Sequence, residues 1–251
     1  MAISVLQAAN NYSIYQVKPL RVTLPEATAA GSYLVVVVQA QKSGAPFNIG
    51  LLNAHTPNPI ITDDKSNSYT TVDSIVGVTQ EVTSGLAHPD ASGFFSSAYV
   101  YTVAAAAGTQ NIDIAAFYPD EAISPIQPGG NLASPPNVNG RPVFDGGLYA
   151  QVFEVAGLIT GVDAHNHASS DATALGSALI TTSAAAIIFE VGLMIDSSTI
   201  GTGTNAVMRF SNSLGSSHGL VQTTIVGAAA ASAGFTNSLR YTGAVVAVSL
   251  K

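Results

Sequence analysis

Short runs of β-branched, aromatic and other apolar residues recur along the chain, and turn-forming Gly, Asn, Asp, Ser or Pro residues bound each run. This pattern is typical of β-strands. The predicted strands are residues 21–24, 33–40, 98–103, 110–118, 147–155, 186–195, 219–226 and 240–250. In one of them, Ile112 and Ile114 alternate with Asn111 and Asp113, which predicts a strand with one buried face. Residues 61–70 predict a strand, a polar turn and the start of a second strand.

Helical patterns are nearly missing from the sequence. The alanine-rich stretches at 104–107 and 228–231 lack the charged face that a surface amphipathic helix needs. No helical segment separates the predicted strands, so we expect antiparallel pairing rather than parallel crossovers. The sequence therefore predicts an all-β fold, an antiparallel two-sheet β-sandwich of the jelly-roll type, in which residues 1–251 form a single domain.

A proline- and glycine-rich segment, residues 119–147, interrupts the rhythm of strands and contains half of the chain's 12 prolines. Such a composition excludes a helix or a ladder strand. Two interpretations remain open, a long loop or arm that projects from one domain and a linker between two smaller β domains. We favour the loop because neither half of the sequence shows a self-contained set of strands. No clean internal repeat emerges.

Charged residues make up only 9% of the chain, against about 25% in an ordinary soluble domain. The net charge of −7 and the few, scattered basic residues argue against a broad surface for nucleic acid or anionic lipid. The absence of cysteine excludes disulfides, thiolate metal sites and a cysteine nucleophile. The longest apolar runs, 33–38 and 184–189, are too short for a membrane-spanning helix, and residues 1–9 lack the features of a secretory signal.

The sequence contains no recognisable catalytic motif, neither a nucleophile elbow nor a phosphate-binding or dinucleotide-binding glycine loop. Glu154 and Glu190 lie in predicted strands and are the pair that a glycosidase would need to converge. Outward-facing, solvated strand positions explain both more simply. In Ser216-Ser217-His218, neighbouring strand residues point to opposite faces and no third group orients them. We therefore predict no catalytic residues and no enzymatic activity.

Two polar clusters are candidate metal sites. On an extended strand His165 and His167 would share one face and could hold a metal together with Asp163 or Asp171, although an exposed polar loop is the simpler interpretation. The adjacent pair Asp63-Asp64 offers oxygen ligands for calcium, but such a pair in a turn usually caps backbone amides. We assign neither a metal nor a cofactor.

Aromatic residues cluster in the middle of the sequence and offer a different possibility. They would form either a sugar-stacking platform on one sheet face or ordinary core and cross-strand packing, and packing is the commoner case. The residues concerned are Tyr99, Tyr101, Phe117, Tyr118, Tyr149 and Phe153.

The order of several segments resembles that of jelly-roll β-sandwich proteins of tailed-bacteriophage virions, which include capsid decoration (cement) proteins and tail or fibre domains. The segments that carry the resemblance are 23–25, 29–38, 61–70, 110–114 and 241–250. The proline-rich insertion departs from simple modules of that kind. The resemblance implies a non-enzymatic virion protein, most simply a decoration protein that clamps adjacent shell subunits.

The partners expected from this resemblance are a major capsid protein or another virion component, and further copies of the chain in a homo-oligomer such as a trimer. Low charge density fits this interpretation because interface cores are depleted in charge. Residues 1–17 and 119–147 are the segments that we expect to reach a neighbouring subunit. The alternative is a tail-fibre or receptor-binding module that recognises carbohydrate.

Overall fold

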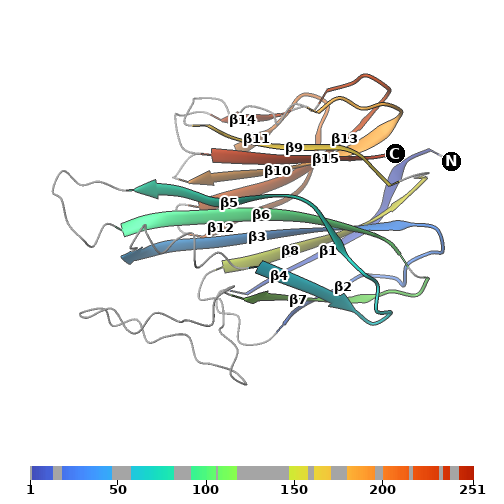
Figure 1. The fold of residues 1–251 in the computed structure, drawn as a ribbon, viewed down its shortest axis with the longest axis horizontal. Coiled ribbons are helices and arrows are strands. Elements are labelled where there is room, and N and C mark those ends of the chain that lie inside the picture. The colour runs from blue at the N-terminus through green and yellow to red at the C-terminus, as the bar shows by residue number, and fades with distance from the viewer. Residues whose placement is uncertain are drawn as a thin grey trace.

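The computed structural model in Figure 1 describes residues 2–13, 19–46, 58–81, 92–105, 107–117, 147–157, 161–170, 180–195, 200–214, 217–231, 234–237 and 243–251. These residues form strands and turns and no helix, so the all-β prediction is confirmed. The strands are β1 (Ser4–Ser13), β2 (Leu20–Thr23), β3 (Tyr33–Pro46), β4 (Asn58–Asp63), β5 (Thr70–Glu81), β6 (Ser92–Ala104), β7 (Asn111–Phe117), β8 (Gly147–Ala156), β9 (Val162–Ser170), β10 (Ala186–Ile195), β11 (Ile200–Thr202), β12 (Val207–Leu214), β13 (Ser217–Val226), β14 (Phe235–Asn237) and β15 (Gly243–Leu250).

Two five-stranded sheets form the centre of the molecule, and every strand pairing within the described ranges is antiparallel. The first large sheet has the order β1-β8-β3-β6-β5, and the second large sheet has the order β12-β13-β10-β15-β9. Two smaller sheets, β2-β7-β4 and β11-β14, accompany them. The predicted antiparallel arrangement is therefore confirmed.

The two large sheets pack face to face through a shared apolar core, which we call the inter-sheet core. Val35, Val37 and Phe153 of the first large sheet meet Ile187 and Phe189 of the second in this cluster. The centroids of the Phe153 and Phe189 rings lie 5.2 Å apart. This packing is that of the expected sandwich.

The outer face of each large sheet is also covered, which a simple two-sheet sandwich would leave in water. Leu34 and Val36 of β3 pack against Ile112 and Ile114 of β7 in a second apolar cluster. On the other side, β10 and β15 pack against Phe235 of β14. Figure 1 shows the small sheets on opposite sides of the large pair, β11 and β14 at the top and β2, β4 and β7 below. The chain therefore stacks four layers, and burial on both faces explains the unbroken apolar run in β3.

The strand order of the first large sheet recurs in the second. Reading from the edge, β5-β6-β3-β8-β1 corresponds to β12-β13-β10-β15-β9, and β4-β7 corresponds to β11-β14. Among the described residues, no strand of the second set matches β2, but Thr181 forms an isolated antiparallel bridge with Ala231 just before β14. The first set spans β1 to β8 and the second spans β9 to β15. The topology thus contains a repeat that the sequence does not display.

A matching turn supports this correspondence. In the first set the Thr28 amide donates to the Thr109 carbonyl and the Gly108 amide donates to the Thr28 carbonyl, both at 2.9 Å. In the second set Thr182 has the same relation to Ala230 and Ala229, at 3.1 and 2.7 Å. Gly108 and Ala229 both adopt a positive φ, 87° and 60°. The two sets therefore share a backbone turn as well as a strand order.

The segment 119–147 follows β7 and ends at the start of β8 of the first set, and its residues 119–146 are outside the described ranges. β8 follows this segment and pairs with β1 and β3, which precede it. The strands on either side of the segment therefore belong to one set, which favours the loop over the linker.

Part of the N-terminal segment 1–17, which we expect to reach a neighbouring subunit, is a strand of the chain's own first large sheet. Residues 4–13 form β1, which pairs with β8 of the same chain from Ser4 opposite Ala156 to Ser13 opposite Leu148. Ile3 and Val5 pack against the inter-sheet core. This part of the segment is held within the chain because β8 takes its backbone hydrogen bonds and the core takes its apolar side chains.

Candidate functional site

Glu154 on β8 is a buried structural carboxylate with an exposed fraction of 2%. Its oxygens accept hydrogen bonds from Gln7 Nε2 at 2.6 Å, from the Ala29 amide at 2.7 Å and from Ser32 Oγ at 2.7 Å. These donors come from β1 and from the loop that leads into β3. Glu154 therefore fastens an edge strand and a loop to the centre of the first large sheet.

Glu190 on β10 plays a similar part in the second large sheet and is completely buried. It accepts hydrogen bonds from the Gly234 amide at 2.8 Å and from Gln222 Nε2 at 2.7 Å. Gln222 in turn accepts a hydrogen bond from the Gly203 amide at 2.9 Å. This network ties the β11-β14 sheet to the outer face of the second large sheet.

The two glutamates do not converge. Each follows a phenylalanine, Phe153 or Phe189, whose ring lies in the inter-sheet core. Because successive strand side chains point to opposite faces, Glu154 and Glu190 point away from each other, each toward the outer face of its own sheet. The glycosidase pair is therefore excluded. The simpler explanation, solvated positions, is also wrong, because loops and small sheets cover both outer faces.

The prediction of a sugar-stacking platform is wrong for four of its six residues, because their side chains are at most 6% exposed. These residues are Tyr99, Tyr101, Tyr149 and Phe153. The Tyr101 hydroxyl donates to the Pro59 carbonyl at 3.0 Å, and burial raises the Tyr101 pKa to about 12. These side chains pack in the core, as the alternative interpretation held. The side chain of Phe117 and the whole of Tyr118 lie outside the described part of the chain.

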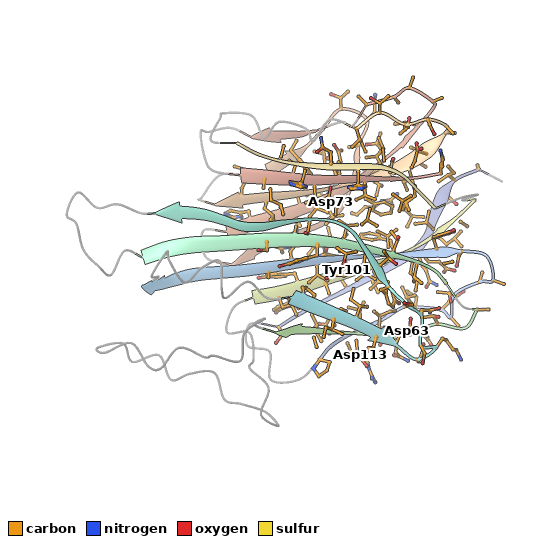
Figure 2. The ribbon with its side chains drawn as sticks, in the orientation of Figure 1. Asp63, Asp73, Tyr101 and Asp113 are labelled. Carbon is orange, nitrogen blue, oxygen red and sulfur yellow. The ribbon has the colours of Figure 1, made fainter. Side chains whose placement is uncertain are left out.

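Asp63 and Asp64 cap a turn, as expected, and Figure 2 shows Asp63 at the end of β4. Asp63 accepts hydrogen bonds from the Lys65 amide at 2.8 Å and from the Tyr69 hydroxyl at 2.7 Å. Burial acts to raise the Asp64 pKa, but hydrogen bonds from the amides of Gln110 and Asn111 outweigh it and lower that pKa below its ordinary value. Donors of the same chain therefore satisfy the oxygens of both carboxylates, as expected for side chains that cap a turn.

His218 lies on β13, which begins at Ser217, and the side chain of Ser217 lies outside the described part of the chain. Ser216 lies outside the described residues. The predicted lack of a nucleophile paired with His218 therefore stays a prediction.

His165 and His167 lie in a strand, β9, so the exposed-loop interpretation is wrong and the same-face prediction is confirmed. Their Nδ1 atoms both contact the Asp73 carboxylate, His165 with Oδ2 at 3.1 Å and His167 with Oδ1 at 2.8 Å. Both imidazoles are about half exposed, 51% and 52%, whereas the Asp73 side chain is only 9% exposed. We call these three residues the histidine–aspartate clasp.

The clasp joins the edges of the two large sheets. Asp73 lies on β5, the edge strand of the first, and the histidines lie on β9, the edge strand of the second. His165 and His167 pair with Val248 and Val246 of β15, which belong to the inter-sheet core. The clasp therefore lies at one side of the inter-sheet core, where its polar side chains connect the two edge strands. Figure 2 shows Asp73 between the two sheets.

The carboxylate that meets the histidines is not one of the two that the sequence suggested. Asp171 lies outside the described residues, and Asp163 faces Lys251 and Ser183 instead. Within the described ranges, no group of three or more His, Asp or Glu side chains is arranged to hold a metal ion. The same ranges contain no helix that could cross a membrane.

Asp163, whose side chain is 4% exposed, forms an ion pair with the partly exposed Lys251, Oδ1 to Nζ at 2.7 Å, and accepts hydrogen bonds from Ser183. The hydrogen bond from Lys251 is the main reason that the Asp163 pKa falls to about 2. A carboxyl pKa that is lower in the folded state contributes stability above its unfolded value, which is near 4, and that stability disappears as the pH falls toward 2.

Replacing Asp163 with asparagine is therefore expected to lower the free energy of unfolding at pH 7 by about 0.5–1 kcal/mol, because its partner Lys251 is partly exposed to water. The difference from wild type should shrink between pH 4 and pH 2. Urea unfolding of both proteins at several pH values measures it. A difference that stays constant down to pH 2 would contradict the assignment.

No protein-family model matches the chain, and no curated protein or solved structure matches it either.

Proposed function

We propose that the chain is a non-enzymatic structural protein of a virion, a capsid decoration protein that stabilises the shell through protein–protein contacts. The observation that carries this proposal is the repeated strand order. In each set the first and last strands are neighbours, and the last strand lies between the first strand and the central strand, β3 or β10. We interpret each set as a jelly roll, an architecture that recurs in viral capsid proteins and lectins.

Because both sets share the inter-sheet core, we infer that residues 1–251 are one domain built from two jelly rolls. The use of the carboxylates supports a structural role. Glu154, Glu190, Asp63 and Asp64 all accept hydrogen bonds that hold loops and strands in place. These four carboxylates, which would be candidate acids and bases in a hydrolase, therefore accept hydrogen bonds that stabilise the fold.

The side of the sandwich opposite the clasp supports contact with other protein. It ends in two edge strands, β1 of the first large sheet and β12 of the second. Large apolar side chains are exposed there, Leu6 and Tyr12 on β1 and Val207 and Met208 on β12, by 52–60%. Edge strands with exposed apolar side chains favour association. We propose this side as the surface where copies of the chain meet.

Light scattering of the purified chain tests this surface, and a homo-oligomer predicts a mass that is a multiple of 25.5 kDa. Met208→Glu is expected to yield the monomer because it places a charge in the contact. Ile60→Glu is the matched control, since Ile60 is 51% exposed on β4, away from that side. A wild-type monomer, or equal dissociation by both variants, would overturn the proposed surface.

The partner is tested by mixing the chain with shells assembled from the major capsid protein of the virus that, on this proposal, carries its gene. Saturable co-sedimentation is expected, together with increased resistance of the shells to heat. Selective retention on a glycan array without binding to shells would instead establish the alternative, a carbohydrate-binding module of a tail or fibre.

A further inference from the structure

We propose that the histidine–aspartate clasp is a binding site for one divalent transition-metal ion, with His165 and His167 as ligands and Asp73 as the group that positions them. This inference does not depend on the proposed function. It begins with the contacts of the two rings, because each Nδ1 faces a separate oxygen of one carboxylate.

These contacts determine which ring nitrogen can bind a metal. A neutral imidazole carries its proton on one nitrogen and a lone pair on the other. A carboxylate accepts, so a neutral ring whose Nδ1 faces it favours the tautomer with the proton on Nδ1 and the lone pair on Nε2. Metal-binding histidines in proteins usually have this arrangement, with the second nitrogen donating to a carboxylate that fixes the ring.

Burial separates the roles of the three residues. The Asp73 side chain is 9% exposed and also accepts a hydrogen bond from the Ser74 amide at 2.8 Å, so it is a fixed anchor. The imidazoles are half exposed, so solvent and dissolved ions reach the two rings. The negative charge of Asp73 also offsets part of the charge of a divalent cation.

Spacing and surroundings complete the site. Positions i and i+2 of a strand share a face, and the residues paired with the two histidines across β15 are valines, which bring no competing charge. Asp73 is turned to the Nδ1 side and is not a ligand, which agrees with the finding that the described residues hold no three-ligand group. The ion would thus have two protein ligands and open positions. Imidazole ligands favour Zn²⁺, Cu²⁺ or Ni²⁺ over Ca²⁺ or Mg²⁺.

Isothermal titration of the full chain with ZnCl₂ at pH 7.5 tests the site. One ion per chain is expected. His165→Ala and His167→Ala should each lower the affinity by at least tenfold, and Asp73→Asn by roughly 10–100-fold, as for other groups that hold a metal ligand. His218→Ala is the matched control, because His218 lies on β13 and should leave the affinity unchanged.

Circular dichroism and thermal unfolding without zinc show whether each variant is folded, and a zinc-dependent rise in the melting temperature is the second measurement. The rise should be present in wild type and His218→Ala and lost in the double variant His165→Ala/His167→Ala. No heat of binding at millimolar zinc, or binding that the double variant retains, would overturn the site. Equal affinity of Asp73→Asn and wild type would overturn the role of Asp73.

Discussion

Replacing Glu154 with alanine is expected to lower the free energy of unfolding by about 3–5 kcal/mol. The substitution leaves three donors without their acceptor, Gln7 Nε2, the Ala29 amide and Ser32 Oγ. An unsatisfied buried donor costs roughly 1–3 kcal/mol. Urea unfolding followed by circular dichroism measures the change, with the far-ultraviolet signal reporting the β-structure.

Glu26→Ala is the control for this variant. Glu26 belongs to the same loop, but its side chain is exposed, so we expect a change within about 0.5 kcal/mol. Glu154→Gln should lie between the two, because an amide keeps one acceptor oxygen and lacks the charge. A loss below about 1 kcal/mol for Glu154→Ala would show that the carboxylate does not hold the loop and β1 in place.

Replacing Phe189 with alanine is expected to have a comparable effect, a loss of about 3–5 kcal/mol. The ring is fully buried between the two large sheets and meets Phe153 across them. Its removal leaves a cavity in the core that both sets of strands share. The same unfolding measurement applies, and a single transition is expected if both sheets unfold together.

Ile225→Ala is the matched control, since Ile225 belongs to the same sheet but is 58% exposed. It should cost far less than Phe189→Ala. The double variant Phe153→Ala/Phe189→Ala should cost less than the sum of its single variants, because contacting residues are not independent. Equal effects of Phe189→Ala and Ile225→Ala would mean that the large sheets do not depend on a common core.

The strands that the sequence revealed are those with dense apolar patterns. The ranges 33–40, 147–155 and 186–195 correspond to β3, β8 and β10, the inner strands that are buried on both faces. The predictions missed β1, β9 and β12, which are edge strands with many polar residues. They also missed β11 and β14, which are too short to show a period of two.

The candidate site was only partly predictable. The shared face of His165 and His167 follows from their spacing alone. Asp73 lies 92 positions before His165 in the sequence and meets it only because two edge strands come together, so no local pattern could identify it. Glu154 and Glu190 were misjudged because a two-sheet sandwich exposes its outer faces, and here small sheets and loops cover them.

The placement of β8 and β15 has a consequence for the order in which the chain can fold. Each is the last strand of its set, yet each is inserted between two strands made much earlier, β1 and β3 or β9 and β10. During synthesis, the first large sheet therefore remains split until β8, which begins at Gly147, leaves the ribosome. Sheets closed by such distant pairings form slowly. Until then the unpaired edges of β1 and β3 are exposed to other chains, which makes this intermediate prone to aggregation.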